Sequence, residues 1–119
     1  MRIFDILAMI KYSEESRDDM EMNFNEYNKT AELLKTIAHP VRLCIIKGLL
    51  EKGECNVTYM QSCLGTPQST VSQHIQKLKA AGIIEGRRSG LEIYYRVKSD
   101  KVAALMRLMF SENGETKAE

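Results

Sequence analysis

The sequence predicts a mainly α-helical domain with one small β-hairpin near its end, an α+β class. Three observations predict it. Apolar residues recur at helical spacing through most of the chain, glycines and prolines divide it into short segments, and the apolar pattern becomes alternating after Gly82. With 119 residues, 44% of them hydrophobic, the chain can bury one modest core. The expected order is α-α-α-α-β-β-α, with an extra N-terminal helical segment before it.

The domain itself is expected over residues 26–110, and residues 111–119 are expected to be a flexible tail. Residues 1–25 form an extension. Its opening turns place Phe4 and Leu7 at helical spacing, and the acidic stretch that follows has no glycine or proline. That stretch could be a linker, a disordered arm or the solvated part of a long helix. We interpret the extension as helical and associated with a dimer, with Phe4 and Leu7 packing on the partner.

Three helices are expected before the central one. The first covers about residues 26–37. The second begins at Pro40, because proline suits the first helical position, and ends at Gly53. Its apolar stripe includes Cys44, which is therefore interpreted as a core residue rather than a reactive one. The third is short and runs from Asn56, a good N-cap, to Leu64.

The stretch from Thr66 to Gly82 has a full set of helix-end signals. Thr66 is a candidate N-cap, Pro67 fills the first helical position, and Gly82 stands where a terminating glycine belongs. One face carries a narrow aliphatic stripe that would anchor the helix to a core: Val71, Ile75 and Leu78. The opposite face is polar and has no acidic residue: Ser69, Thr70, Gln73, Gln76 and Lys77.

Such a helix has the chemistry to lie in a DNA major groove. Glutamine can pair with adenine edges, serine and threonine reach bases or phosphates, and lysine pairs with phosphate. An ordinary surface helix is the alternative, since polar outer faces are common. Only Gly65 and Thr66 separate this helix from the short one before it, and two helices joined by so short a turn form a helix-turn-helix.

The residues after Gly82 are expected to form a two-stranded hairpin, because apolar and polar side chains alternate in the second segment, residues 91–97. Arg87, Arg88 and Ser89 lie near its tip. A hairpin directly after a recognition helix is the wing of a winged helix-turn-helix, where arginines can bind phosphate or enter the minor groove. The alternative for the two arginines is a solvated turn.

Ser99 is expected to cap the last helix. Its apolar stripe consists of Val102, Leu105, Met106 and Met109. One small winged helix does not need so much apolar surface at its end. The excess predicts pairing with the same helix of a second subunit, a homodimer, or with the N-terminal helix, and a role in the chain's own core is the alternative.

The charges are unevenly distributed. Residues 1–39 carry five basic and eight acidic side chains, whereas residues 40–100 carry nine basic and five acidic ones. The positive excess therefore accompanies the candidate recognition helix and suits a polyanion partner. No apolar run approaches the roughly 18 residues of a membrane span, and the first residues lack a signal-peptide cleavage site. The expected location is the cytoplasm.

Three segments together resemble the ArsR/SmtB family of bacterial winged-helix repressors: AELLKTIAHPVRLCII, PQSTVSQHIQKLKAAGIIEGRRSG and LEIYYRV. The similarity covers about residues 31–110. The combination NVT, PQSTVSQH and GLEIYY is especially similar to the non-metal protective-antigen gene repressor branch, which regulates virulence genes. The resemblance implies a homodimeric, sequence-specific transcriptional repressor that binds an imperfect palindrome of double-stranded DNA.

The same resemblance implies which residues contact DNA. In the helix they are Gln68, Ser69, Thr70, Ser72, Gln73, His74 and Lys77, and in the wing Arg87, Arg88, Ser89 and Gly90. The two recognition helices of a dimer would meet half-sites one duplex turn, about 34 Å, apart. His74 is expected to be half-buried, with a hydrogen bond to phosphate or backbone.

The family's metal sites are not matched. One uses a Cys-x-Cys pair, where this chain has Asn56 and Thr58, with Cys55 one position too early. Another uses Asp and His on the last helix, and no histidine follows His74. We therefore expect no metal and no cofactor. An odd number of cysteines without a secretory signal indicates reduced thiols.

Two rivals to a plain repressor remain. A thiol-based redox or persulfide-responsive repressor would use Cys55, whose pKa a nearby helix N-terminus would lower; an unreactive boundary cysteine is the alternative. A winged helix used only as a protein-interaction module would have no affinity for random duplex. No catalytic arrangement of serine, histidine and aspartate, paired carboxylates or phosphate-binding glycine loop is present, so we expect no enzyme.

Overall fold

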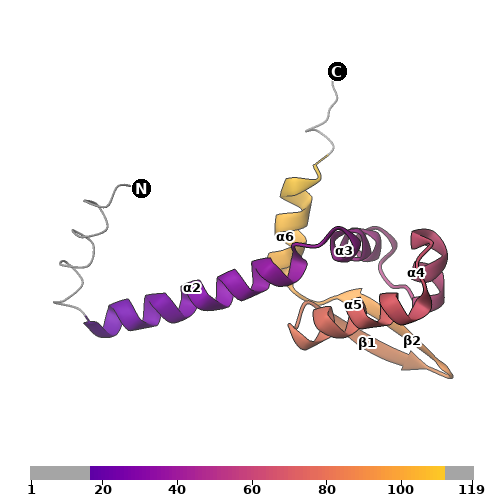
Figure 1. Ribbon diagram of the computed structural model, residues 1–119, viewed down its shortest axis with the longest axis horizontal. Coiled ribbons are helices and arrows are strands. Elements are labelled where there is room, and N and C mark those ends of the chain that lie inside the picture. Colours follow the sequence, from indigo (N-terminus) through magenta and orange to yellow (C-terminus); the bar gives the residue numbers. More distant parts are fainter. Residues whose placement is uncertain (1–16, 112–119) are drawn as a thin grey trace, which may run out of the picture. The chain divides into compact units, whose positions relative to one another are not determined.

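The computed structural model describes residues 17–111, which form five helices and two strands (Figure 1). In chain order the elements are α2 (Arg17–Ile37), α3 (Pro40–Lys52), α4 (Val57–Leu64), α5 (Gln68–Ala80), β1 (Ile84–Ser89), β2 (Glu92–Val97) and α6 (Asp100–Met109). The predicted class and order are confirmed. The chain divides into two units between Lys35 and Thr36.

Helix α2 is longer than the sequence pattern predicted. It begins at Arg17 rather than near residue 26, because the acidic stretch before residue 26 has no glycine or proline to end a helix. Three large apolar side chains of α2 are exposed: Phe24, Tyr27 and Leu34. Phe4 and Leu7 lie outside the described residues.

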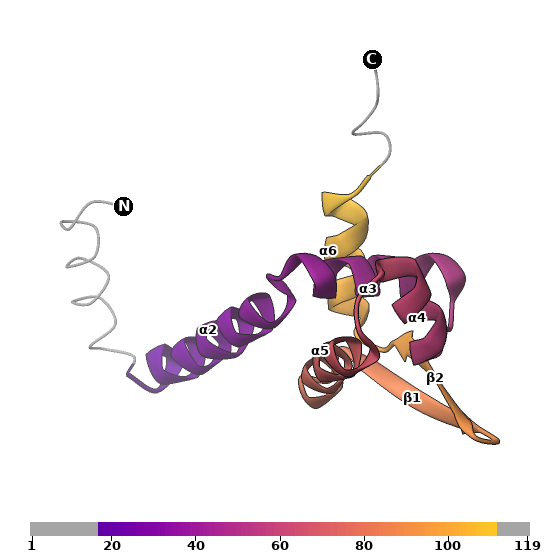
Figure 2. The ribbon, with the colours of Figure 1, turned by 45° about the vertical axis from the view of Figure 1, so that its right-hand side comes forward.

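The core of the second unit comes from three helices and the start of the hairpin. Its most deeply buried side chains are Ile46, Leu49, Val71, Ile75, Leu78, Ile83, Ile84 and Val102. Full burial of each such side chain contributes about 1.5–3 kcal/mol relative to exposure. The predicted stripe of α5 is thereby confirmed, and α3 contacts both α5 and α6 (Figure 2).

Three helix N-termini are fixed by a side chain that accepts a hydrogen bond from the first turn. His39 Nδ1 accepts a hydrogen bond from Val41 N at 3.1 Å, directly before Pro40. Asn56 Oδ1 accepts from Tyr59 N at 2.8 Å, and Ser99 Oγ accepts from Val102 N at 3.1 Å. These side chains satisfy backbone donors that a helix leaves free at its first turn.

Two local predictions were wrong. Thr66 does not cap α5, because its hydroxyl donates back to Leu64 O at 3.3 Å and Pro67 occupies the N-cap position without a side-chain hydrogen bond. Cys44 is exposed rather than part of the core. The buried face of α3 consists of Ile45, Ile46 and Leu49, so the true stripe is rotated away from Cys44.

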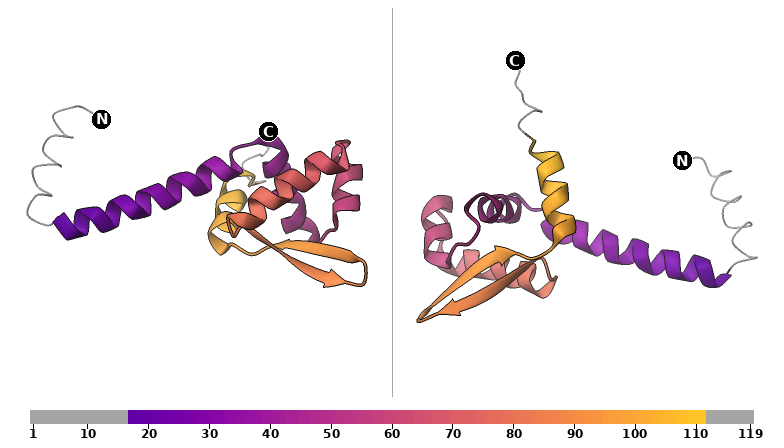
Figure 3. Two further views of the ribbon diagram at one scale, coloured as in Figure 1. Left: turned by 60° about the horizontal axis from the view of Figure 1, so that its bottom comes forward. Right: turned by 180° about the vertical axis from the view of Figure 1, so that it is seen from behind.

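The hairpin pairs Ile84 with Val97 and Ser89 with Glu92, and its turn lies at the end far from α6 (Figure 3). Gly90 adopts a φ of 67°, which a two-residue turn needs and which glycine adopts without strain. Gly86 is also required, because a Cβ there would lie 2.9 Å from Ile93 Cγ2. The base of the hairpin is joined to the α3–α4 loop by two backbone hydrogen bonds between Cys55 and Tyr95.

Candidate nucleic-acid interface

Helices α4 and α5 form a compact helix-turn-helix. Gly65, Thr66 and Pro67 connect them, and Gly65 ends α4 in the left-handed conformation with a φ of 64°. Helix α5 contacts α4, α3 and β1. The second helix is therefore held from three sides, and the polar face opposite its buried stripe is free to meet a ligand.

The exposed face of α5 carries amides, hydroxyls and cations. Gln68, Ser69, Gln73 and Lys77 are exposed, while Thr70 and Ser72 are half-buried beside them. No acidic residue lies in the first turn, and no side chain caps the N-terminus. Backbone N–H groups at an uncapped helix start favour a phosphate oxygen. The side chains of α5 predicted to contact DNA are thus exposed or half-buried, and none of them belongs to its buried stripe.

His74 links α5 to α3 instead of standing apart. Its Nδ1 accepts a hydrogen bond from Arg42 Nε at 3.2 Å, and its ring centroid lies 4.6 Å from that of His39. Burial lowers the pKa of His74, and the nearby His39, Arg42 and Lys77 lower it further. His74 is half-buried, as expected, and the partner of its Nδ1 within the protein is the side chain of Arg42. The uncharged imidazole orients Arg42, which also donates to Thr36 O at 2.6 Å.

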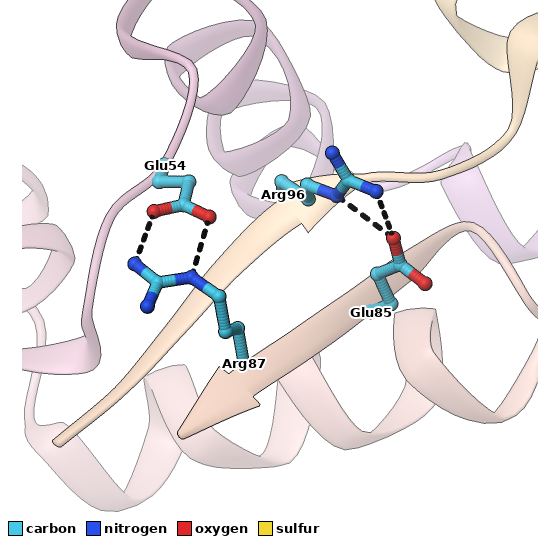
Figure 4. Close-up of polar contacts among 4 residues, drawn as sticks. All are labelled: Glu54, Glu85, Arg87 and Arg96. Carbon is cyan, nitrogen blue, oxygen red and sulfur yellow. Dashed lines mark hydrogen bonds and ion pairs between the residues drawn. The ribbon is translucent and has the colours of Figure 1, made fainter. Parts of the chain in front are cut away.

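The two wing arginines differ in their surroundings. Arg87 forms a bidentate ion pair with Glu54, with Nη2 2.7 Å from Oε1 and Nε 3.1 Å from Oε2 (Figure 4). Its guanidinium carbon also lies 5.5 Å from the ring centroid of Tyr94. Arg88 Nη1 donates only a long hydrogen bond, 3.4 Å, to Gly90 O. Of the two wing arginines, only Arg87 pairs with a carboxylate among the described residues 17–111, so Arg88 is the better placed of the two to bind a phosphate.

No local sequence pattern predicts this ion pair, because Glu54 and Arg87 are 33 residues apart along the chain. A second contact across the same gap joins Asn56 Nδ2 to Glu92 Oε1 at 3.1 Å. Arg96 pairs with Glu85 across the strands, with Nη2 2.7 Å from Oε2. Glu54 and Asn56 together hold the wing against the α3–α4 loop.

The ion pair between Glu54 and Arg87 is expected to break at low pH, when the Glu54 carboxylate becomes protonated. The hydrogen bond from Arg87 lowers the pKa of Glu54 below its ordinary value of 4.5. A carboxyl whose folded pKa is lowered stabilises the fold above its unfolded pKa, and this contribution is lost as the pH falls through the folded value. We expect a ¹³C-carboxyl NMR titration to give Glu54 a pKa below 4.5, and Arg87→Ala to raise it.

Arg96→Ala is the matched control, because Arg96 acts on Glu54 only through a weaker long-range attraction. It should raise the pKa of Glu54 less than Arg87→Ala does. An equal effect of the two substitutions would show that general positive charge, and not the bidentate contact, holds Glu54 ionised.

The candidate redox residue Cys55 is buried, and burial raises the pKa of its thiol. The expectation of a lowered pKa was wrong, because Cys55 precedes the N-cap Asn56 and is buried where its backbone pairs with Tyr95 of β2. A thiol of raised pKa has little thiolate at neutral pH. Within residues 17–111, no group of three or more histidine, cysteine or carboxylate side chains is arranged to hold a metal ion.

The predicted dimer residues of α6 fall into two groups. Val102 and Met106 are buried in the core of their own unit, and Leu105 is half-buried. Met109 is 69% exposed, and Leu108 and Phe110 beside it are exposed as well. The apolar surface that α6 leaves uncovered is therefore its last turn.

A helix-turn-helix whose second helix is followed by a basic antiparallel hairpin defines a winged helix-turn-helix DNA-binding protein. Residues 37–87 match the helix-turn-helix domain family. The transcriptional repressor PagR of Bacillus anthracis is 41% identical over 91 residues, which are 76% of this chain and 91% of that protein. Its crystal structure superposes with a TM-score of 0.67 at 42% identity, covering 72% of this chain and 98% of that one.

Two further relatives are also transcriptional repressors. The biofilm growth-associated repressor of Xylella fastidiosa is 40% identical over 96 residues, 81% of each chain. The repressor SmtB of Mycobacterium tuberculosis is 40% identical over 84 residues, 71% of this chain and 62% of that protein. The chain belongs to the ArsR/SmtB family of winged-helix transcriptional repressors, and it is a DNA-binding repressor of that type. No helix within residues 17–111 has the length and hydropathy needed to cross a bilayer.

Proposed function

We propose that the protein represses transcription as a homodimer that places two α5 helices in successive major grooves of an imperfect palindrome. One observation supports this most directly: α5 buries Val71, Ile75 and Leu78 while its opposite side, free of acidic residues, is exposed. A helix fixed by its apolar stripe can enter a major groove without unfolding or turning.

Affinity and specificity are assigned to different side chains. Lys77, Arg88 and the uncapped amides at the start of α5 bind phosphates and supply most of the affinity. Gln73, with Ser69 and Thr70, discriminates bases, because an amide side chain can pair with both N6 and N7 of adenine. Arg87 orients the wing through Glu54.

The dimer is proposed from exposed apolar surface in each unit taken separately. The last turn of α6 exposes Leu108 and Met109, its C-cap Phe110 is exposed as well, and α2 exposes Phe24, Tyr27 and Leu34. Contiguous apolar side chains at a surface are typical of interfaces, and a two-fold pairing uses the same patch on both subunits.

Repression is proposed to need no metal and no cofactor. The positions that match the family's Cys-x-Cys pair carry Asn56, which caps α4, and Thr58. Neither side chain offers the thiolate that soft or borderline metals require. We propose that the protein is not an enzyme. Its proposed location is the cytoplasm, since a repressor acts where its operator is.

DNA binding is tested by fluorescence anisotropy on a random duplex and on an operator recovered by genomic footprinting, over a range of salt concentrations. Arg88→Ala should weaken binding to both duplexes and make the slope of log K against log salt shallower by about one, because one phosphate contact is lost.

Arg96→Ala removes an equal charge that is paired with Glu85, and it should leave the slope nearly unchanged. An unaltered slope in Arg88→Ala would contradict a phosphate contact from the wing. Indifference of the wild-type protein to both duplexes at low salt would overturn the proposed function itself.

A further inference from the structure

A groove of about 250 Å³ lies between α3 and α4, away from the polar face of α5. Its lining includes Cys44, Gly48, Cys55, Tyr59, Met60 and Cys63. All three cysteines of the chain therefore share one groove, although they are not arranged to hold a metal ion. The volume is below the roughly 300–1,000 Å³ of pockets for drug-sized ligands, so an occupant must be small.

Gly48 keeps this groove open. It lies in the middle of α3, where a glycine disfavours the helix relative to alanine. A Cβ built on Gly48 would meet no atom within 4 Å, and its φ is not positive, so neither packing nor backbone conformation requires a glycine there. Any larger side chain at this position would occupy the groove.

The two charged side chains of the lining, Glu51 and Lys52, each already have a contact within the protein. Glu51 accepts from Lys47 at 2.6 Å, and the Lys52 ammonium lies 4.9 Å from the ring centroid of Tyr59. The rest of the lining is apolar or carries sulfur. Sulfur is polarisable and makes favourable contacts with aromatic rings. The groove therefore suits an uncharged aromatic molecule better than an anion or a cation.

We propose that the groove between α3 and α4 binds a small uncharged aromatic molecule, and that this binding weakens the affinity of the repressor for DNA. The first part stands on the groove alone, whereas the second rests on the proposed function.

The structure offers a direct route from the groove to the DNA-binding elements. Cys55 lines the groove and is joined by two backbone hydrogen bonds to Tyr95 of the wing. Its neighbours Glu54 and Asn56 hold Arg87 and Glu92. Helix α4, the other wall, packs against α5. A ligand that separates α4 from α3 changes the position of the recognition helix and the wing together.

The test uses indole as a neutral aromatic probe and indole-3-carboxylate as its charged counterpart. Indole should bind the full-length protein saturably, with a Kd on the order of 1 mM or tighter, and shift the ¹³C-methyl resonance of Met60. Indole-3-carboxylate should bind at least about tenfold more weakly, because burying its carboxylate is costly and the Lys52 ammonium of the lining already contacts the Tyr59 ring.

Two variants fill the groove from opposite walls. Gly48→Leu on α3 and Cys63→Leu on α4 should each weaken indole binding at least about tenfold. Ser62→Leu is the matched control, because Ser62 is exposed on α4 and outside the lining; indole binding should be unchanged. Saturating indole should lower DNA affinity at least about fivefold in wild type and in Ser62→Leu, but not in Gly48→Leu.

Indole binding that ignores both filling substitutions, or no saturable binding at all, would overturn the site. Saturable binding in the groove with unchanged DNA affinity would overturn the regulatory part. If the wild-type protein does not bind DNA even without indole, the proposed function is overturned, whereas the result for indole binding in the groove still stands.

Discussion

Replacing Met109 by aspartate is expected to convert the protein into a monomer and to weaken its operator affinity at least about 100-fold. Met109 is 69% exposed between the exposed side chains of Leu108 and Phe110. Two carboxylates facing each other across a two-fold interface repel and lose hydration without a partner. A monomer then binds each half-site separately and loses the effective concentration that links the two subunits, typically a factor of about 10²–10⁴. Analytical ultracentrifugation measures the first effect and fluorescence anisotropy the second.

Leu91→Asp is the control for the oligomeric state. Leu91 is 98% exposed at the turn of the hairpin, so the substitution also adds a negative charge to an exposed apolar position. It should leave the subunit association intact. A Met109→Asp variant that remains dimeric with a wild-type dissociation constant would exclude the last turn of α6 from the interface. A monomer with unchanged operator affinity would instead exclude two-fold binding.

Much of the fold could be predicted because its boundaries depend on local chemistry. Helices begin where a side chain accepts a hydrogen bond from a backbone N–H of the first turn, as at His39, Asn56 and Ser99. Helix α4 ends where Gly65 adopts the left-handed conformation. Each of these signals involves atoms only a few residues apart. The stripe on α5 and the change of period after Gly82 are equally local. Such signals can be interpreted without knowing what packs against them.

The features that could not be predicted depend on contacts between distant segments. The face of α3 that meets the core is chosen by α5 and α6, so the side of the helix that carries Cys44 could not be assigned from the spacing of its own apolar residues. Cys55 is buried because Tyr95 pairs with it, which raises its pKa against the effect expected of a helix N-terminus.

Contacts between distant segments also decide how the two wing arginines of the candidate DNA interface differ. The sequence marks Arg87 and Arg88 as equivalent cations in one turn. Only the fold brings Glu54 to Arg87, whereas Arg88 pairs with no carboxylate in the part of the chain that the structure describes. The pattern of residue types therefore predicted which elements form the candidate DNA interface, but not which arginine of the wing is paired within the protein itself.

Gln73→Ala is expected to separate specificity from affinity. Gln73 is exposed on the polar face of α5, next to the half-buried Ser72 and His74. Its amide can donate to N7 and accept from N6 of one adenine, and losing such a bidentate pair costs about 1–3 kcal/mol of discrimination. We expect the operator Kd to rise roughly 5- to 150-fold, in line with that energy, while the Kd for random duplex barely changes.

Gln76→Ala serves as the comparison, since Gln76 is an exposed glutamine of the same helix outside the set assigned to DNA. It should change neither Kd by more than about twofold. Binding to operators altered at single positions then locates the contact, because Gln73→Ala should lose its preference at one base pair in each half-site and keep it elsewhere. Equal losses on operator and random duplex would remove Gln73 from base recognition and assign it to the phosphate contacts, with the discrimination left to Ser69 and Thr70.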